Sequence, residues 1–180
     1  TMAYDKSLAD RIHAALTAEI EQLDDAVKRL RRDHPMIARL HTIPGVGLFG
    51  ALFLVAEIGS IERFSSSHRL TAYAGLVPTT RSSGGRTSHG GTGHASNRWL
   101  KWILVEIVQT LKRAPGPVGH QYRRLLRAKG KPKATTAAAR KLCCYIYWMW
   151  RSGQSYDEWL ADRGASRSAV CPSQPLGAVA

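Results

Sequence analysis

The chain has 180 residues, 44% of them hydrophobic, which is enough to bury the core of one ordinary domain. It carries 26 Lys and Arg against 13 Asp and Glu, a net charge of +13. Residues 1–40 hold seven basic and seven acidic side chains, whereas the stretch from Arg63 to Tyr156 holds 17 Lys or Arg and one acid, Glu106. This imbalance is too large to favour an ordinary solvated surface, and it predicts a polyanionic partner, either nucleic acid or an anionic membrane face.

Several classes of protein are disfavoured by the cysteines, the histidines and the apolar runs. Neither a disulfide framework nor a C-x-x-C zinc pair can be drawn from Cys143, Cys144 and Cys171, which fits a reducing cytoplasm. His89 and His94 lack further ligands at a usable spacing, so no metal site is predicted. We find no signal peptide and no apolar run of 18 residues, so we expect a cytoplasmic protein without a membrane span.

Residues 7–33 have the pattern of an amphipathic helix. Its apolar residues are spaced by alternating steps of four and three, at Leu16, Ile20, Leu23, Val27 and Leu30. A seam this narrow suits a coiled coil, and hence a homo-oligomer, or an arm packed on another helix. With so few heptads, an ordinary surface helix is an equal alternative. We assign residues 1–35 to a coiled-coil helix.

The rest of the chain predicts a mainly α domain over residues 36–160, followed by a disordered tail over 161–180. Few alternating β-branched runs occur, and glycines at 84, 85, 90, 91 and 93 indicate a long loop. The expected order is a short helix over 36–40, an apolar helix over 48–58, a short helix near 66–73, a serine-containing glycine-rich loop over 81–96, a helix over 97–113, a basic connector over 123–133 and a helix over 134–153.

The first glycine-rich segment, "TIPGVGLFGALF", contains a G-x-G-x-x-G at Gly45, Gly47 and Gly50. A dinucleotide site needs a buried strand before the first glycine and an acid closing a second strand about 20 residues later. Here the preceding segment carries a charge, and Pro44 comes directly before Gly45, which is poor strand material. The dinucleotide interpretation is therefore excluded.

The same segment fits a helix-hairpin-helix over 40–58. In such a motif two short helices meet at a tight turn, where glycines let backbone N–H groups approach a DNA phosphate beside the start of the second helix. The alternative is an ordinary tight turn between helices. We favour phosphate binding and assign it to Pro44, Gly45, Val46 and Gly47.

Catalytic groups are scarce. Acids after residue 41 are few, and none lies in a strand pattern, so this chain should not hold catalytic Mg²⁺. Ser82 and Ser83 lie between Arg81 and Arg86, where a hydroxyl could attack a phosphodiester while guanidiniums stabilise the phosphorane. From composition alone, the simpler interpretation of Ser-Ser-Gly-Gly is a loop.

Several stretches between Leu40 and Asp157, in the same order, resemble one family. They are "IPGVGLFGALFLVAEIGSIERF", "GLVPTTRSSGGR", "GHASNRWLKWILVEIVQ" and "ARKLCCYIYWMWRSGQSYD". They are similar to the C-terminal domain of insertion-sequence transposases that have a DEDD RuvC-like N-terminal domain and use a bridge RNA. The helix over 7–33 resembles the coiled coil that joins the two domains in that family.

The resemblance implies that Ser83 is a nucleophile that links covalently to a DNA 5′ phosphate, with Ser82 as the alternative. It places the Mg²⁺ site in the DEDD domain, so we expect no cofactor in this chain and no recombination by this chain alone. Gly75, Leu76 and Pro78 match the family's GL-x-P step, and Asn97, Arg98 and Leu100 match its GN-x-x-L helix start. Ser96 departs from the family, which usually has glycine there.

Our hypothesis is therefore a transposase C-terminal domain that binds DNA and guide RNA. The expected contacts are Arg81, Arg86, Asn97, Arg98 and Lys101, together with the 44–47 turn. The rival hypothesis is a non-catalytic helix-hairpin-helix nucleic-acid-binding module. A membrane-surface protein is disfavoured, because the aromatic residues over 145–150 lack lysines on an opposite face and are expected in the core.

Overall fold

The computed structural model describes residues 6–83, 86–92 and 96–165, and over these residues the expected mainly α fold is confirmed. A two-stranded antiparallel hairpin interrupts the helices. In chain order the elements are α1 (Lys6–Asp33), α2 (Pro35–His41), α3 (Leu48–Ile58), the 3₁₀ turn η1 (Ile61–Arg63), α4 (Ser67–Tyr73), β1 (Pro78–Ser83), β2 (Arg86–Thr92), α5 (Arg98–Leu111), α6 (Pro117–Ser152) and α7 (Tyr156–Ala165).

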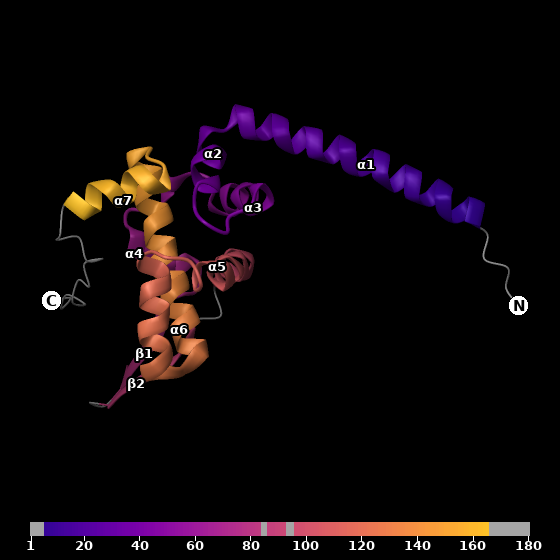
Figure 1. The fold of residues 1–180 in the computed structure, drawn as a ribbon. Helices are drawn as coiled ribbons and strands as arrows, with labels where there is room; N and C mark the ends of the chain where they lie inside the picture. The colour runs from indigo at the N-terminus through magenta and orange to yellow at the C-terminus, as the bar shows by residue number, and fades with distance from the viewer. Residues whose placement is uncertain (1–5, 84–85, 93–95, 166–180) are drawn as a thin grey trace, which may run out of the picture.

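Helix α1 is an arm that projects away from a compact body (Figure 1). Its 28 residues span about 42 Å at 1.5 Å per residue, and it contacts the body at α2 and α3. Most of the apolar seam predicted for this helix lies in solvent, since the side chains of Leu16, Ile20, Leu23 and Leu30 are 52–65% exposed, while Val27 is half-buried.

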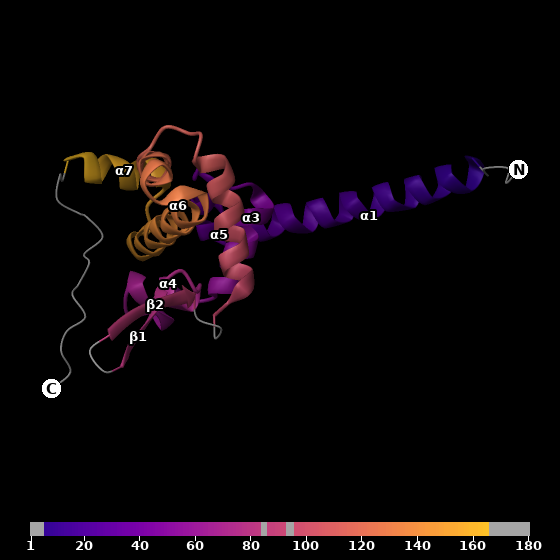
Figure 2. The ribbon, with the colours of Figure 1, turned by 90° about the horizontal axis from the view of Figure 1, so that it is seen from below.

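The core of the body lies where α5 packs against α6, with α3 on one side and α4 on the other (Figure 2). Helix α5 is amphipathic with a helical period, and it buries one face through Leu100, Leu104, Val108 and Leu111. The C-terminal half of α6 buries Leu142, Ile146 and Met149 against it, along with Tyr145 and Tyr147, which were expected in the core.

The predicted basic connector over 123–133 is wrong, because α6 is helical from Pro117 to Ser152 with a single break at Gly130. Gly130 has φ 75° and ψ 169°, which is outside the helical region. Pro132 accounts for the break: a proline in a helix interior lacks the N–H and clashes with the preceding turn, but it fits the first turn of a new helix.

The predicted glycine-rich loop over 81–96 is also corrected, because Pro78–Ser83 and Arg86–Thr92 pair as strands. Residues 84, 85 and 93–95 of that loop lie outside the described residues. Two extended runs separated by Gly-Gly are a recognised hairpin signal, and the many glycines in this stretch obscured it.

Helix α7 continues to Ala165, so residues 161–165 are helical rather than part of a tail. It is anchored because Tyr156 and Trp159 are buried and the Trp159 ring contacts the Tyr145 ring, with the centroids 4.3 Å apart and the planes tilted by 51°. The remainder of the predicted tail, 166–180, falls outside the described residues. No helix in the described part of the chain is long and apolar enough to cross a membrane.

Candidate nucleic-acid interface

In the turn between α2 and α3, some residues are buried in the core and the others face solvent. Ile43 and Val46 are buried, whereas Pro44, Gly45 and Gly47 are exposed. The Val46 N–H donates to the Ile43 carbonyl at 3.0 Å, and His41 Nδ1 donates to the Val46 carbonyl at 2.8 Å. The predicted phosphate-binding turn is therefore a rigid loop with its backbone on the surface, apart from the inward-facing Val46.

The two glycines of the turn have different roles. Gly45 has φ +84°, and a Cβ there would lie 2.6 Å from Thr110 Cβ of α5, so the fold itself requires glycine. Gly47 is the N-cap of α3 with φ −70°, which any residue adopts, and a Cβ there would meet nothing within 4 Å. Open space therefore faces the N-terminus of α3, where unpaired backbone N–H groups and the helix dipole favour an anion.

The backbone register of the β1–β2 hairpin separates the two candidate serines. Ser83 pairs with Arg86 and Ser82 pairs with Thr87, while Arg81 pairs with Ser88. Directly paired positions, and positions two apart along a strand, belong to the same side of a sheet. Position 83 thus shares a side with positions 81 and 86, whereas position 82 belongs to the other side.

Asn97 joins three helices at the N-terminus of α5. Its Oδ1 accepts from the Leu100 N–H at 2.9 Å, and its Nδ2 donates to Glu57 Oε2 at 2.6 Å and to Tyr73 Oη at 3.1 Å. Its backbone N–H donates to the Tyr73 carbonyl at 2.8 Å. Both amide hydrogens and the amide oxygen are engaged within the protein, so Asn97 positions the start of α5. An asparagine directly before an apolar helical run is a signal for an N-cap, whereas no local pattern indicates the contacts to Glu57 and Tyr73.

The matches to the GL-x-P step lie beside this junction. Gly75 has φ +65°, and a Cβ there would overlap the Ser96 hydroxyl, so the serine that replaces the usual glycine packs against a bare backbone. Arg98 is exposed and Lys101 half-buried on the first turn of α5. These two predicted phosphate contacts therefore lie together, directly after Asn97.

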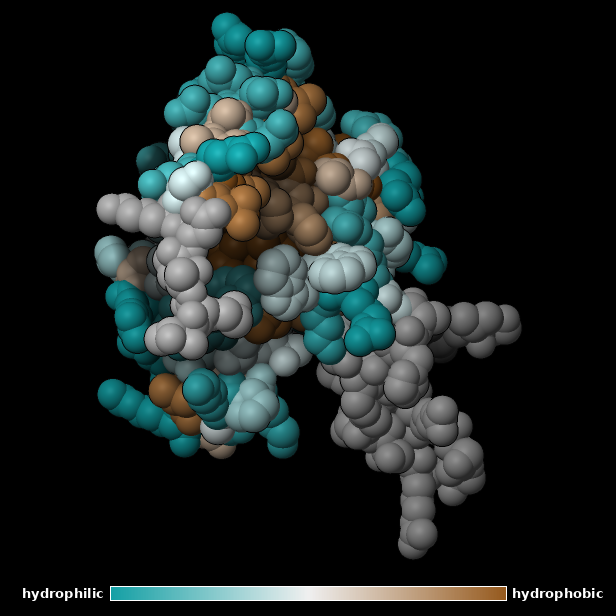
Figure 3. Space-filling view, turned by 90° about the vertical axis from the view of Figure 1, so that its right-hand side faces the viewer, coloured by the Kyte–Doolittle hydropathy of each residue, from teal (hydrophilic) through white to brown (hydrophobic). Residues whose placement is uncertain are grey.

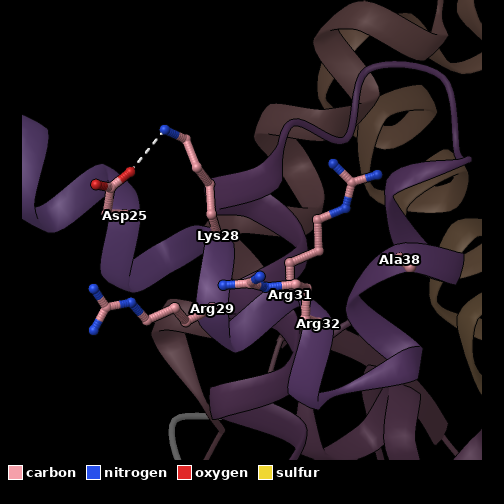
Figure 4. Close-up of a pocket in the computed structure, with 6 residues that line it drawn as sticks. All are labelled: Asp25, Lys28, Arg29, Arg31, Arg32 and Ala38. Atoms are coloured by element: carbon pink, nitrogen blue, oxygen red, sulfur yellow. Dashed lines mark hydrogen bonds and ion pairs between the residues drawn. The ribbon is translucent and has the colours of Figure 1, made fainter.

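A basic cleft, which charge counting missed, lies where α1 meets α2 (Figure 4). It has a volume of about 590 Å³ and is lined by Asp25, Lys28, Arg29, Arg31, Arg32 and Ala38. The hydrogen bond from Lys28 Nζ to Asp25 Oδ1, 2.9 Å long, lowers the pKa of Asp25 and raises that of Lys28.

The three arginines of the cleft form no ion pair with the residues the structure describes, so their charge is available to an anion. The segment 1–40 is neutral overall only because acids nearer the start of α1 offset these arginines. In the sequence, the run Lys28-Arg29-Leu30-Arg31-Arg32 was the local signal for this cleft.

Among the described side chains, no group of three or more His, Cys, Asp or Glu could hold a metal ion. Cys143 and Cys144 are buried, and burial raises the pKa of the Cys143 thiol well above its ordinary value, which disfavours the nucleophilic thiolate.

Residues 37–124, from α2 into α6, match the family described as Transposase IS116/IS110/IS902. The chain is 32% identical over 149 residues to an uncharacterized 43.6 kDa protein of insertion element IS110 from Streptomyces coelicolor, covering 80% of this chain and 36% of the relative. It is 26% identical over 141 residues to the transposase for insertion sequence element IS1111A from Coxiella burnetii, covering 76% of this chain and 39% of the relative. The chain thus spans between a third and two fifths of the length of these relatives.

The two glycines of the turn give a matched test. We expect Gly45→Ala to lower the free energy of unfolding by about 2–4 kcal/mol, because alanine is strained at positive φ and its Cβ would collide with Thr110. Gly47→Ala should cost about 1 kcal/mol or less, since only the N-cap preference changes. Urea denaturation measures both. Equal losses would contradict the different roles assigned to these glycines.

Proposed function

We propose that this chain is a member of the IS116/IS110/IS902 family of insertion-sequence transposases, and that it is the part of a transposase that binds DNA and supplies a serine nucleophile for strand transfer. The observation that carries the proposal is the hairpin register, which groups position 83 with the two arginine positions 81 and 86. The acid-poor, strongly basic sequence around it supports a polyanionic substrate.

In the proposed step the Ser83 hydroxyl attacks a phosphorus of the DNA backbone. The Oγ–P bond forms and the P–O3′ bond breaks, so the 5′ phosphate becomes attached to the serine. The hydroxyl proton ends on the released 3′ oxygen. Arg81 and Arg86 would stabilise the negative charge that grows on the phosphorane oxygens. We further propose that the Mg²⁺ for this step would be held by a DEDD domain outside this chain.

DNA would be gripped through its phosphates at three places. These are the N-terminus of α3 beyond Gly47, the first turn of α5 with Arg98 and Lys101, and the basic cleft at Arg29 and Arg32. Such contacts fix the position of the backbone without reading bases. The target DNA sequence would then be selected by a partner. We propose that this partner is a guide RNA bound by the same basic surface.

A non-catalytic nucleic-acid-binding module is the second candidate. The α2–α3 turn favours it, because a rigid turn with open space before a helix N-terminus suffices for phosphate binding without chemistry. The two functions differ only in whether Ser83 forms a covalent bond to DNA.

We further propose that two copies of the chain associate through α1, whose apolar seam is exposed in the single chain. If Ile20 and Val27 occupy position a of the coiled-coil heptad, Glu19 occupies position g, and Asp24 and Arg31 occupy position e. A parallel pair would place Glu19 against Asp24 of the second copy, two like charges. An antiparallel pair with Val27 facing Leu30 instead places Asp24 against Arg31, so charge favours the antiparallel arrangement.

Substitution of the serines tests the catalytic role. In an assembly that includes the DEDD domain, Ser83→Ala should lower strand transfer by about a thousandfold or more and abolish the covalent DNA adduct, because the attacking oxygen is removed. DNA affinity should change less than about twofold, and Ser82→Ala should retain the adduct. Unchanged strand transfer in the Ser83 variant would favour the non-catalytic module.

A charge exchange tests the antiparallel arm pair. Asp24→Arg or Arg31→Asp alone should raise the dimer dissociation constant about tenfold, because each creates two like-charge contacts in a symmetric pair. The double variant D24R/R31D should restore the dissociation constant of the unsubstituted chain. Sedimentation equilibrium at low salt measures all four proteins. A double variant as weak as the single ones would contradict this arrangement.

A further inference from the structure

Four aromatic residues form a cluster on the surface of the body where α3 packs beside α5. Phe53 lies at its centre, with ring centroids 5.8 Å from Phe49, 6.4 Å from Trp99 and 5.8 Å from Trp102. Phe53 is half-buried, whereas Phe49 is 65% exposed, Trp99 64% and Trp102 45%. Packing of the core does not account for three large aromatic side chains with so much of their surface in water.

The rings of this aromatic cluster leave flat surface uncovered, because no contacting pair is stacked face to face. The planes of Trp99 and Trp102 meet at 89°, and the plane of Phe53 is inclined by 64° to Trp99 and by 72° to Trp102. Phe49 is tilted by 42° to Phe53. The three exposed rings therefore offer planar surfaces to solvent, and these surfaces point in different directions.

Positive charge adjoins the aromatic cluster at the start of α5. Arg98 directly precedes Trp99 and shares a side of the helix with Trp102, four residues later. It is exposed and forms no ion pair with the residues that the structure describes. Lys101 separates the two tryptophans in sequence, so basic and aromatic residues are interleaved on this turn. The one acid of α5, Glu106, lies one turn beyond Trp102, so an anionic group is favoured at the Arg98 end.

The surroundings of the aromatic cluster combine apolar surface with a polar border. Helices α3 and α5 lie on the side of the body toward which α1 projects (Figures 1 and 2). Figure 3 looks at that side and shows a hydrophobic area at its centre, bordered by polar residues. A ligand that complements flat apolar rings next to exposed cations carries planar apolar groups joined by anionic ones. Nucleotides have this chemistry, with bases that stack on aromatic rings and phosphates that bind arginine.

We propose that the aromatic cluster is a stacking site for unpaired nucleotides, with their phosphates bound at Arg98. The inference rests on the proposed binding of nucleic acid and specifies the form that this site takes, a single-stranded segment of DNA or RNA. Rings at steep angles to one another hold bases that point in different directions. A flexible single strand permits this, whereas in a duplex the bases are parallel and their faces are covered by their neighbours.

Two double variants separate stacking from apolar bulk. W99Y/W102Y keeps a flat ring at both positions, whereas W99L/W102L keeps apolar side chains without a ring. The probes are a labelled single-stranded DNA of about 12 nucleotides, the RNA of the same sequence and the DNA duplex. We expect the leucine variant to bind a single strand at least about tenfold more weakly, because two base–aromatic contacts are lost, and the tyrosine variant to stay within about threefold of the unsubstituted chain. Duplex affinity should change less than about twofold in both.

The two single-stranded probes distinguish the source of the unpaired nucleotides. A loss confined to the RNA assigns the site to RNA, and a loss confined to the DNA assigns it to DNA; either supports the proposal. Trp148→Leu, on α6 outside the aromatic cluster and 39% exposed, is the matched control and should bind all three probes normally. Phe49→Leu changes the most exposed ring alone, so it tests stacking even if the double variants fail to fold. It should bind a single strand about threefold more weakly.

Equal single-strand affinity in the leucine and tyrosine variants would overturn the proposal, because the flat ring would then have no role. A duplex affinity that falls as much as the single-strand affinity would overturn it as well, since the tryptophans would then only support the phosphate contacts. If the leucine variant binds every probe normally but self-associates less in sedimentation, the aromatic cluster is a protein contact and the proposal is wrong.

The unsubstituted chain separates this inference from the proposed function. Binding of the duplex without binding of either single strand would leave phosphate binding in place and overturn the stacking site. If the chain binds none of the three probes, both proposals are wrong.

Discussion

The junction at Asn97 fixes how the parts of this surface are arranged. One side chain caps α5, binds the Glu57 carboxylate of α3 and reaches the Tyr73 hydroxyl of α4. The hairpin leaves α4 at Pro78 and its second strand ends at Thr92, so both ends of the hairpin lie close in sequence to this junction. The base of the hairpin and the phosphate contacts on α5 therefore lie close in sequence to one hydrogen-bonded group, whose donors and acceptor are all used. Position 83 lies at the other end of the hairpin, where it pairs with position 86.

The packing around each glycine distinguishes those that the fold requires from the one that is open to a ligand. Gly45 touches Thr110 and Gly75 touches Ser96, so these two let helices and loops approach, whereas Gly47 faces open space. The G-x-G-x-x-G pattern thus combines a packing requirement with an exposed helix start. This division explains why the pattern resembles a nucleotide-binding turn without the strand that such a turn requires.

Local patterns predicted the helices well, and long-range contacts account for what was missed. The apolar run over 48–58 predicted α3 at its observed bounds, and the helix predicted over 97–113 starts one residue before α5 and ends two residues after it. The hairpin was missed because its many glycines indicated a loop and obscured the Gly-Gly turn signal. The residues around the break at Gly130 were interpreted as a connector, although they are helical on both sides of it. The basic cleft was not predicted because the net charge of residues 1–40 is zero, which hides a local excess of positive charge. The helix places Arg29 and Arg32 on the same side, where their charges add. No local pattern shows that Asn97 meets Glu57, 40 residues away.

The central claim is that this chain binds nucleic acid through phosphate neutralisation. The most direct test is the affinity of the 180-residue chain for labelled duplex DNA across a series of salt concentrations. Each phosphate contact contributes a slope of about −0.9 in log K against log salt, so the four cationic contacts at Arg29, Arg32, Arg98 and Lys101 predict a loss of about 150-fold between 50 and 200 mM. Weak binding with no dependence on salt would contradict the claim and leave the positive charge as solvated surface.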